Sequence, residues 1–388
     1  MKPLSINTNS AGAIPGCSGV PPVDGRSLFC NKSVKTHPPD KTLPLPGIAV
    51  FLTPLFVNKP NPKAGVAHFK TIPVAERYRL LVDEKLLKTE NGATSFENRE
   101  PGCLKGGAAM YRHITDTVIH ANDPKSFLDK NYLKQLHGCL YSSIRLPCSS
   151  SGNTKKLESC GQFRKKRAFF RVKNHYTLKG LLEAEQYYKH ISEPQHKIFH
   201  VAEYNSSSSL ASKVVRQIRP SASKLEDYLK DDKYTVDFSP VKHERIDAVM
   251  DELLSGFQQK LAQDVDEPTL FLLLSELASK MDQIHPFQDG NIRVIRGLID
   301  SLLMFYGYCP IFWYDPNIID LYDSNEIARI MASSIDRTNR VIQHMQSGTT
   351  LCGTYQSTKE DKQLSINAFT PQIETLEPPV EKKRKKAF

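Results

Sequence analysis

The chain has 388 residues, of which 39% are hydrophobic, so it is long enough to bury a sizeable core. Its formal net charge of +10 favours acidic partners, phosphate groups among them, without choosing one class. No apolar run approaches the length of a membrane span, and the first residues lack the apolar core of a signal peptide, so we expect a soluble protein.

The eight cysteines are scattered along the chain. They form no C-x-x-C pair and have no companion histidine at zinc-finger spacing. This pattern predicts reduced thiols in a cytosol-like compartment, and hence a cytoplasmic protein.

Residues 1–104 are rich in Pro, Gly, Ser, Asn and Lys. Such a composition disfavours a packed core and predicts an arm or linker. Within it, apolar residues between 75 and 87 are compatible with one short helix.

Helical periodicity begins near residue 105. Apolar residues recur at helical spacing over 108–120 and 129–141. We expect these two segments to open a folded domain.

The stretch Gly161–Val172 interleaves aromatic and basic residues, which suits a strand or hairpin. Arginine, lysine and aromatic side chains also bind nucleic acid, so a nucleic-acid patch is the alternative for this stretch.

Residues 175–238 are less readable: a Tyr- and Glu-rich helix is expected near 178–190, and the whole segment is expected to be an insertion. Two amphipathic helices follow at 244–261 and, after Pro268, at 269–284. The second is apolar on several sides, which predicts a central position in a helical bundle.

The segment His285–Arg296, HPFQDGNIRVIR, combines a base, an acid, a tight turn and two cations. Apolar residues continue at helical spacing after the Gly-Asn turn, so the turn should lead into a helix. The first N–H groups of a helix stabilise an anion, and Gly290 lets the backbone approach a phosphate closely. Arg293 and Arg296 share a helical face, and a guanidinium suits phosphate oxygens. Together these features predict a polyphosphate cradle.

Asp289 directly precedes this cradle, where its carboxylate would repel phosphates unless a cation such as Mg²⁺ bridged them. His285 is the side chain best suited to accept a proton near neutral pH. A hydroxyl that attacks a phosphate needs such a base.

A last helical region is expected between residues 327 and 342. Residues 346–388 are polar and contain the basic cluster Lys382–Lys386, which suits a nuclear localisation signal and a solvated tail equally well. A nuclear signal would fit a bacterial effector that is secreted into a eukaryotic host cell.

The motif segment resembles that of the Fic (filamentation induced by cAMP) family, His-x-Phe-x-(Asp/Glu)-Gly-Asn-Gly-Arg-x-x-Arg. Seven of its eight specified positions match: His285, Phe287, Asp289, Gly290, Asn291, Arg293 and Arg296. Ile292 replaces the second glycine and reduces the clearance beside the phosphates.

The resemblance implies a mainly α fold, a Fic-type helical bundle with a β-hairpin flap, over residues 105–345. The insertion at about 175–238 would interrupt it, and poorly ordered N- and C-terminal extensions would flank it. The flap corresponds to Gly161–Val172, and its exposed edge would align a target protein beside the nucleotide.

The resemblance also implies a protein adenylyltransferase, which moves AMP from ATP to a Ser, Thr or Tyr hydroxyl of a target protein (AMPylation). His285 would be the general base, Asp289 the Mg²⁺ ligand and Phe287 the anchor of the loop. The remaining motif positions would bind the nucleotide: Gly290, Asn291 and the Ile292 backbone as anion cradle, Arg293 and Arg296 at the β- and γ-phosphates.

Many relatives carry an inhibitory Ser/Thr-x-x-x-Glu-(Gly/Asn) sequence. Leu86 and Ala93 stand four residues before the two candidate glutamates, so this chain has no match. Three other functions stay open: transfer of another phosphate-containing group from UTP, GTP or a phosphocholine carrier, a degenerate nucleotide-binding interaction module, and a basic nucleic-acid-binding protein.

Overall fold

The structure is a computed structural model that describes residues 60–89, 92–147, 154–155, 159–172, 176–192, 198–204, 214–218, 220–231, 234–263 and 265–370. Most of the expected N-terminal arm and the cluster Lys382–Lys386 therefore lie outside the described residues. The expectation that the two ends of the chain are poorly ordered also concerns residues outside the described ranges.

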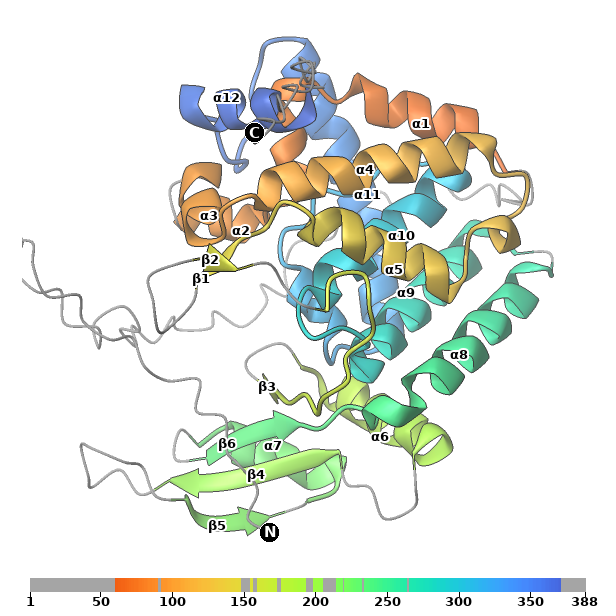
Figure 1. The fold of residues 1–388 in the computed structure, drawn as a ribbon, viewed down its shortest axis with the longest axis vertical. Helices are drawn as coiled ribbons and strands as arrows, with labels where there is room; N and C mark the ends of the chain where they lie inside the picture. Colours follow the sequence, from red (N-terminus) through yellow and green to blue (C-terminus); the bar gives the residue numbers. More distant parts are fainter. Residues whose placement is uncertain are drawn as a thin grey trace, which may run out of the picture. The chain divides into compact units, whose positions relative to one another are not determined.

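The described part is mostly helical, and the expected mainly α fold is confirmed (Figure 1). The α-helices are α1 Pro62–Thr71, α2 Glu84–Thr89, α3 Ala93–Arg99, α4 Cys103–His120, α5 Lys130–Tyr141, α6 Leu178–Ile191, α7 Leu225–Leu229, α8 Ile246–Leu261, α9 Glu267–Ile284, α10 Asn291–Phe305, α11 Ser324–Gln346 and α12 Lys359–Phe369. Short 3-10 helices are η3 Val74–Leu80, η4 Pro124–Ser126, η5 Ala222–Lys224, η6 His243–Arg245 and η7 Pro316–Ile319. The strands are β1 Leu146–Pro147, β2 Thr154–Lys155, β3 Phe170–Val172, β4 Phe199–Tyr204, β5 Val214–Ile218 and β6 Tyr234–Phe238.

Helices α9 and α10 form the centre of the bundle. Helix α9 packs against α8 and α11, and α10 packs against α1, α4 and α5. Asp266 starts α9 because its carboxylate accepts a hydrogen bond from Thr269 N at 2.9 Å, and Pro268 occupies the first turn. Nearly every side chain of α10 from Val294 onward is buried, so the helix that follows the motif turn is rigidly packed.

A four-stranded antiparallel sheet lies at one end of the bundle, far from α12 (Figure 1). Its strand order is β3-β6-β4-β5, so β3 is an edge strand. Only Phe170–Val172 of the stretch Gly161–Val172 is a strand, and it pairs with β6 rather than within a hairpin of its own. The other three strands come from the expected insertion. In a sheet with one exposed face, successive side chains of a strand are alternately buried and exposed. Phe163 and Arg164 are consecutive and both buried, so β3 cannot extend back through them.

Residues 60–104 belong to the folded bundle, although their composition predicted an arm. Phe69, Ile72 and Tyr78 are buried core residues. Helix α1 touches α10 so closely that a Cβ on Gly65 would clash with the Met304 carbonyl. The composition of residues 1–104 was misleading because it averaged this segment with the Pro- and Gly-rich residues before it.

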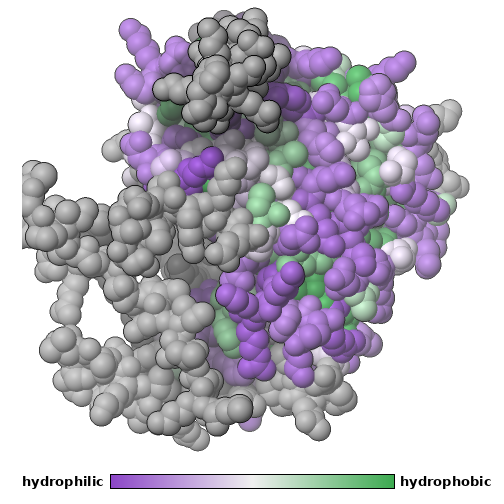
Figure 2. Space-filling model, in the orientation of Figure 1, coloured by the Kyte–Doolittle hydropathy of each residue, from purple (hydrophilic) through white to green (hydrophobic). Residues whose placement is uncertain are grey.

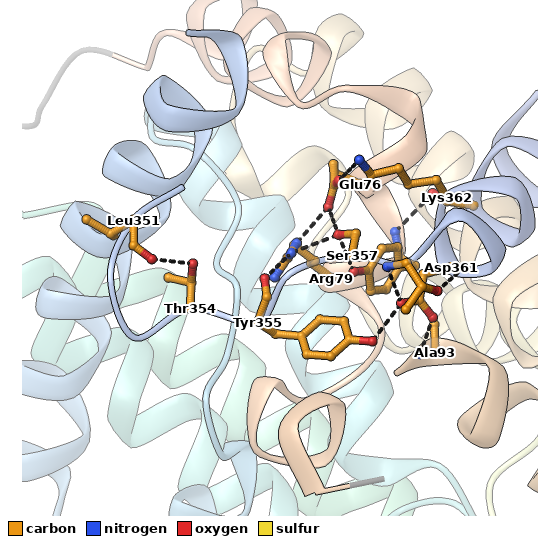
Figure 3. A network of polar contacts seen from close by, with 12 residues as sticks. Glu76, Arg79, Ala93, Leu351, Thr354, Tyr355, Ser357, Asp361 and Lys362 are labelled. Atoms are coloured by element: carbon orange, nitrogen blue, oxygen red, sulfur yellow. Dashed lines mark hydrogen bonds and ion pairs between the residues drawn. The ribbon is translucent and has the colours of Figure 1, made fainter. Parts of the chain in front are cut away.

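The expected polar tail also contains structure, because α12 packs against η3 and α4. A polar network joins α12 to η3 and to the start of α3 (Figure 3). The buried carboxylate of Asp361 accepts hydrogen bonds from Ala93 N at 2.7 Å and from Tyr355 OH at 2.8 Å. It also accepts from Thr358 N at 3.0 Å, which completes a capping box at the start of α12. One carboxylate therefore binds the first residues of both α3 and α12.

No helix in the described ranges combines the length and the apolar character needed to cross a membrane. Hydrophilic residues predominate on the face drawn in Figure 2, and the hydrophobic residues there form small separate areas.

We expect Asp361→Asn to lower the free energy of unfolding by about 1–3 kcal/mol, because an amide cannot accept all three hydrogen bonds. Thermal unfolding measured at pH 7 checks this. Glu360→Gln, at an exposed position in the same turn, is the matched control and should change stability by a few tenths of a kcal/mol.

The stability that Asp361 contributes should depend on pH in a defined direction. Burial alone would raise the pKa of Asp361, but the hydrogen bonds from Thr358, Tyr355 and Ala93 outweigh it and lower the pKa below 3.8. The stabilisation by Asp361 is complete above pH 3.8 and is lost as pH falls through the lowered pKa. Equal unfolding temperatures of the Asn variant and the wild type at pH 7 would contradict this role.

Candidate active site

Helix α9 ends at Ile284, and His285 follows it in a left-handed conformation with φ 51° and ψ 61°. Among the described residues it is the only non-glycine residue with positive φ. Its N–H closes the helix by donating to Met281 O at 3.0 Å. This conformation costs about 1–2 kcal/mol for an L-residue, so neighbouring contacts must hold it.

Arg164 supplies those contacts from the loop before β3. Its side chain is almost fully buried, and its Nε donates to the His285 carbonyl at 2.7 Å. Its two Nη atoms donate to the carbonyls of Ile284, Lys166 and Val241. Within the described residues no carboxylate forms an ion pair with this guanidinium, and burial lowers its pKa to about 10. Arg164 therefore binds backbone carbonyls. From the sequence alone it could not be separated from the exposed basic residues that follow it.

Phe287 anchors the loop after His285, as the resemblance implied. Its buried ring stacks on His137 with centroids 4.2 Å apart and an interplanar angle of 7°, and Phe163 meets it edge-on at 5.3 Å. The side chain of Asn291 forms two hydrogen bonds to the Phe287 backbone. Its Oδ1 accepts from Phe287 N at 2.8 Å, and its Nδ2 donates to Phe287 O at 3.0 Å. Any contribution of Asn291 to anion binding would come from its backbone.

His137 on α5 is a structural residue of the site that sequence reasoning missed. Its Nδ1 accepts from Gly161 N at 2.8 Å, and its Nε2 lies 3.3 Å from the Asp289 carbonyl. Burial lowers its pKa to about 4, so the ring is neutral at physiological pH with Nε2 as the donor. In the sequence, His137 was only one residue of an expected helix.

Gly290 precedes α10 with φ 74°, and an added Cβ would lie 2.5 Å from the ring of Tyr141. A side chain is therefore excluded here by both conformation and space. The carboxylate of Asp289 accepts from Gly290 N at 2.7 Å, and no side chain caps α10 from the N-cap position. The positive end of the α10 dipole thus lies beside Asp289.

Both motif arginines are paired with carboxylates from the N-terminal segment. Arg293 forms a two-pronged ion pair with Glu100, with Nη1–Oε2 at 2.6 Å and Nη2–Oε1 at 2.9 Å. Arg296 is buried, with Nη1 2.6 Å from Asp83 Oδ1 and Nη2 donating to Leu80 O at 2.9 Å. Sequence reasoning missed Glu100 and Asp83 because it assigned their segment to an arm.

Ile292 is half-buried and packs against the hydrophobic core. Asp289 is also half-buried, and no group of three His, Cys, Asp or Glu side chains that could hold a metal ion occurs in the described ranges. Mg²⁺ bound with phosphates often uses only one or two protein carboxylates. The donor set at Asp289 therefore fits such an ion, although it would not form an all-protein metal cage.

The edge strand β3 lies directly beside the base. The ring of Phe170 stacks on the imidazole of His285 at a centroid distance of 5.2 Å. Just before the strand, Lys165, Lys166 and Arg167 are exposed, and no described carboxylate pairs with them. The imidazole itself is 19% exposed. The site thus brings together a partly exposed imidazole, a helix N-terminus and a strand edge that, within the described ranges, pairs with no further strand and lies beside exposed positive side chains.

Comparison with known proteins agrees with this arrangement. Residues 209–303 match the model of the Fic/DOC family. Phosphocholine transferase AnkX of Legionella pneumophila is 23% identical over 343 residues, which cover 80% of this chain and 33% of AnkX. The chain thus spans about a third of the length of this curated relative. The family match includes the whole motif segment, so residues 209–303 form a segment that is similar to the Fic/DOC family.

Proposed function

We propose that the chain is a transferase that moves a phosphate-containing group from a nucleotide donor to a hydroxyl side chain of a target protein. One observation carries the proposal: the partly exposed imidazole of His285 stacks on Phe170 of the edge strand β3, at the start of the loop that leads into the uncapped N-terminus of α10. The helix N-terminus would bind a phosphate and the strand edge an extended target segment.

The reaction would be a single displacement at phosphorus. The target hydroxyl oxygen forms a bond to phosphorus, its proton passes to Nε2 of His285, and the bond to the leaving phosphate breaks. The N–H groups at the start of α10 are fixed before the reaction and stabilise negative charge on the transferred group. Arg164 keeps His285 in place by holding its carbonyl.

Asp289 would hold Mg²⁺, which when bound offsets the negative charge of the donor phosphates. The missing side chain of Gly290 lets the Tyr141 ring pack against the turn. The Ile292 side chain packs toward the core, so its backbone N–H remains at the start of the helix.

The pairing of the arginines bears on the choice of donor. AMP transfer from ATP was expected to place Arg293 and Arg296 at the β- and γ-phosphates. Arg296 is buried against Asp83, and Glu100 occupies both prongs of Arg293. A donor with only two phosphates requires fewer free cations, and AnkX, the similar protein, is a phosphocholine transferase. We therefore rank phosphocholine from a nucleoside diphosphate first and AMP from ATP second.

The target would add a strand to the free edge of β3. Backbone hydrogen bonds position such a segment without reading its sequence, and nearby side chains then select it. Lys165, Lys166 and Arg167 are exposed beside this edge without described carboxylate partners. We therefore propose a target segment that carries acidic residues near the modified hydroxyl.

We expect His285→Ala to reduce transfer by about 100- to 10,000-fold, because the attacking hydroxyl loses its base. The assay uses Mg²⁺, a eukaryotic lysate and labelled CDP-choline, ATP, UTP and GTP in separate reactions, and follows label on protein. His120→Ala, at the exposed end of α4, is the matched control and should keep full activity. Undiminished transfer by the His285 variant, or no transfer with any donor, would refute the proposed function.

Reversing the charges of Lys165, Lys166 and Arg167 to Glu should raise KM for the target protein at least tenfold and leave donor hydrolysis by water unchanged. The positive side chains attract the target but do not touch the donor. Lys63, Lys70 and Lys105, which are exposed on α1 and α4, give a control with the same change in net charge. If instead the first variant loses polynucleotide binding with no effect on target KM, the stretch is a nucleic-acid site.

A further inference from the structure

The proposed base has one ring nitrogen that faces the protein interior. Nδ1 of His285 is buried and has no hydrogen-bond partner. A buried polar nitrogen without a partner costs about 1–3 kcal/mol, so an unpaired Nδ1 requires an explanation.

In the described ion pairs, the carboxylate that lies beside this nitrogen is that of Asp282. It lies one helical turn before His285 on α9, and its Oδ1 is 3.8 Å from Nδ1. Its side chain is only 3% exposed, and within the described residues no Arg or Lys forms an ion pair with it. His285 is thus the one potential cation beside a buried carboxylate.

A second carboxyl group approaches Asp282 from the loop after η7. Burial raises the pKa of Asp320 well above 3.8, and the charge and hydrogen bond of Asp282 raise it further. The raised pKa favours the protonated form of Asp320, whose hydroxyl can donate a hydrogen bond to Asp282.

Two other polar side chains near the pair form hydrogen bonds with backbone carbonyls. Arg164 donates to the His285 and Ile284 carbonyls, and Tyr188 OH donates to the Gln283 carbonyl. Asp315 adds a further negative charge near Asp320. Since none of these groups bonds to Nδ1, Asp282 is the acceptor available to it.

We propose that Asp282, supported by the carboxyl group of Asp320, positions His285 by accepting a hydrogen bond from Nδ1–H. The present distance exceeds that of a charge-assisted hydrogen bond by about 1 Å, so the proposal requires the imidazole and the Asp282 carboxyl group to move closer together. Such contacts often tighten only when substrate is bound.

This role deepens the proposed function and rests on it. With the proton fixed on Nδ1, the lone pair is on Nε2, the nitrogen that must take the proton of the target hydroxyl. The imidazolium formed in that step then lies beside the negative charge of Asp282. Asp282 is a positioning residue because it touches neither donor nor target.

The test combines a spectroscopic and a kinetic readout on the full chain. Long-range ¹H–¹⁵N spectra of protein labelled in its histidines report the tautomer of His285, which is assigned by comparison with His285→Gln. We expect the Nδ1–H tautomer in the wild type. Asp282→Asn should lose this preference, because its amide offers a donor to Nδ1, and should lower kcat at least tenfold with little change in the donor KM.

Three further variants separate positioning from folding. Asp320→Asn keeps a neutral donor to Asp282 and should retain the tautomer, whereas Asp320→Leu should weaken the preference. Glu276→Gln, on α9 but paired with Lys260 and Lys280, is the matched control and should match the wild type. If Asp282→Asn does not fold, the difference in the His285 tautomer between Asp320→Asn and Asp320→Leu tests the proposal instead.

An Nε2–H tautomer in the wild type, or a tautomer and kcat unchanged in Asp282→Asn, would overturn the inference. If the tautomer depends on Asp282 but no donor supports transfer, positioning stands and the proposed function fails. The two ideas can therefore fail separately.

Discussion

The site depends on one buried guanidinium. Arg164 donates to the carbonyls on either side of the point where α9 ends, and this holds His285 in a left-handed conformation that an L-residue otherwise disfavours. Without this side chain the carbonyls would remain buried and unpaired, at a cost of about 1–3 kcal/mol each. The same arginine belongs to the loop that leads into β3. Its contacts therefore place the base and the strand edge side by side, and the stacking of Phe170 on His285 follows from that connection.

The two ends of the described chain also shape the site. Asp361 on α12 bonds the first N–H of α3, and Glu100, directly after α3, pairs with Arg293. Asp83, between η3 and α2, pairs with Arg296. These contacts form a continuous structural connection from the C-terminal helix to the motif. Glu100 and Asp83, which flank the N-terminal helices, are thus the acidic partners of the two motif arginines.

The sequence predicted those parts of the fold that depend on local pattern. The helices expected at 129–141, 244–261 and 269–284 occur within a few residues of their expected ends, since each has a periodic apolar face. The strand pairing was not predictable, because β3 pairs with β6 about 65 residues further along the chain and the alternation of its three residues is too short to specify a partner. Arg164 could not be distinguished from Lys165 and Lys166, because burial depends on the tertiary fold. Acidic residues such as Glu100 gave no local signal of their distant arginine partners.

The matched motif positions divide into two groups by what their side chains do. Three residues set the shape of the loop. Phe287 stacks in the core, Gly290 has no side chain and so makes room for the Tyr141 ring, and Asn291 forms hydrogen bonds with the Phe287 backbone. His285, Asp289 and the two arginines carry the proton or the charge. A motif of this kind can keep its shape while the charges around it change, because the groups that pair with the arginines lie outside it. The loop therefore carries the similarity to the Fic/DOC family. In the proposed function, the choice of donor would depend on residues such as Glu100 and Asp83, which the motif does not include.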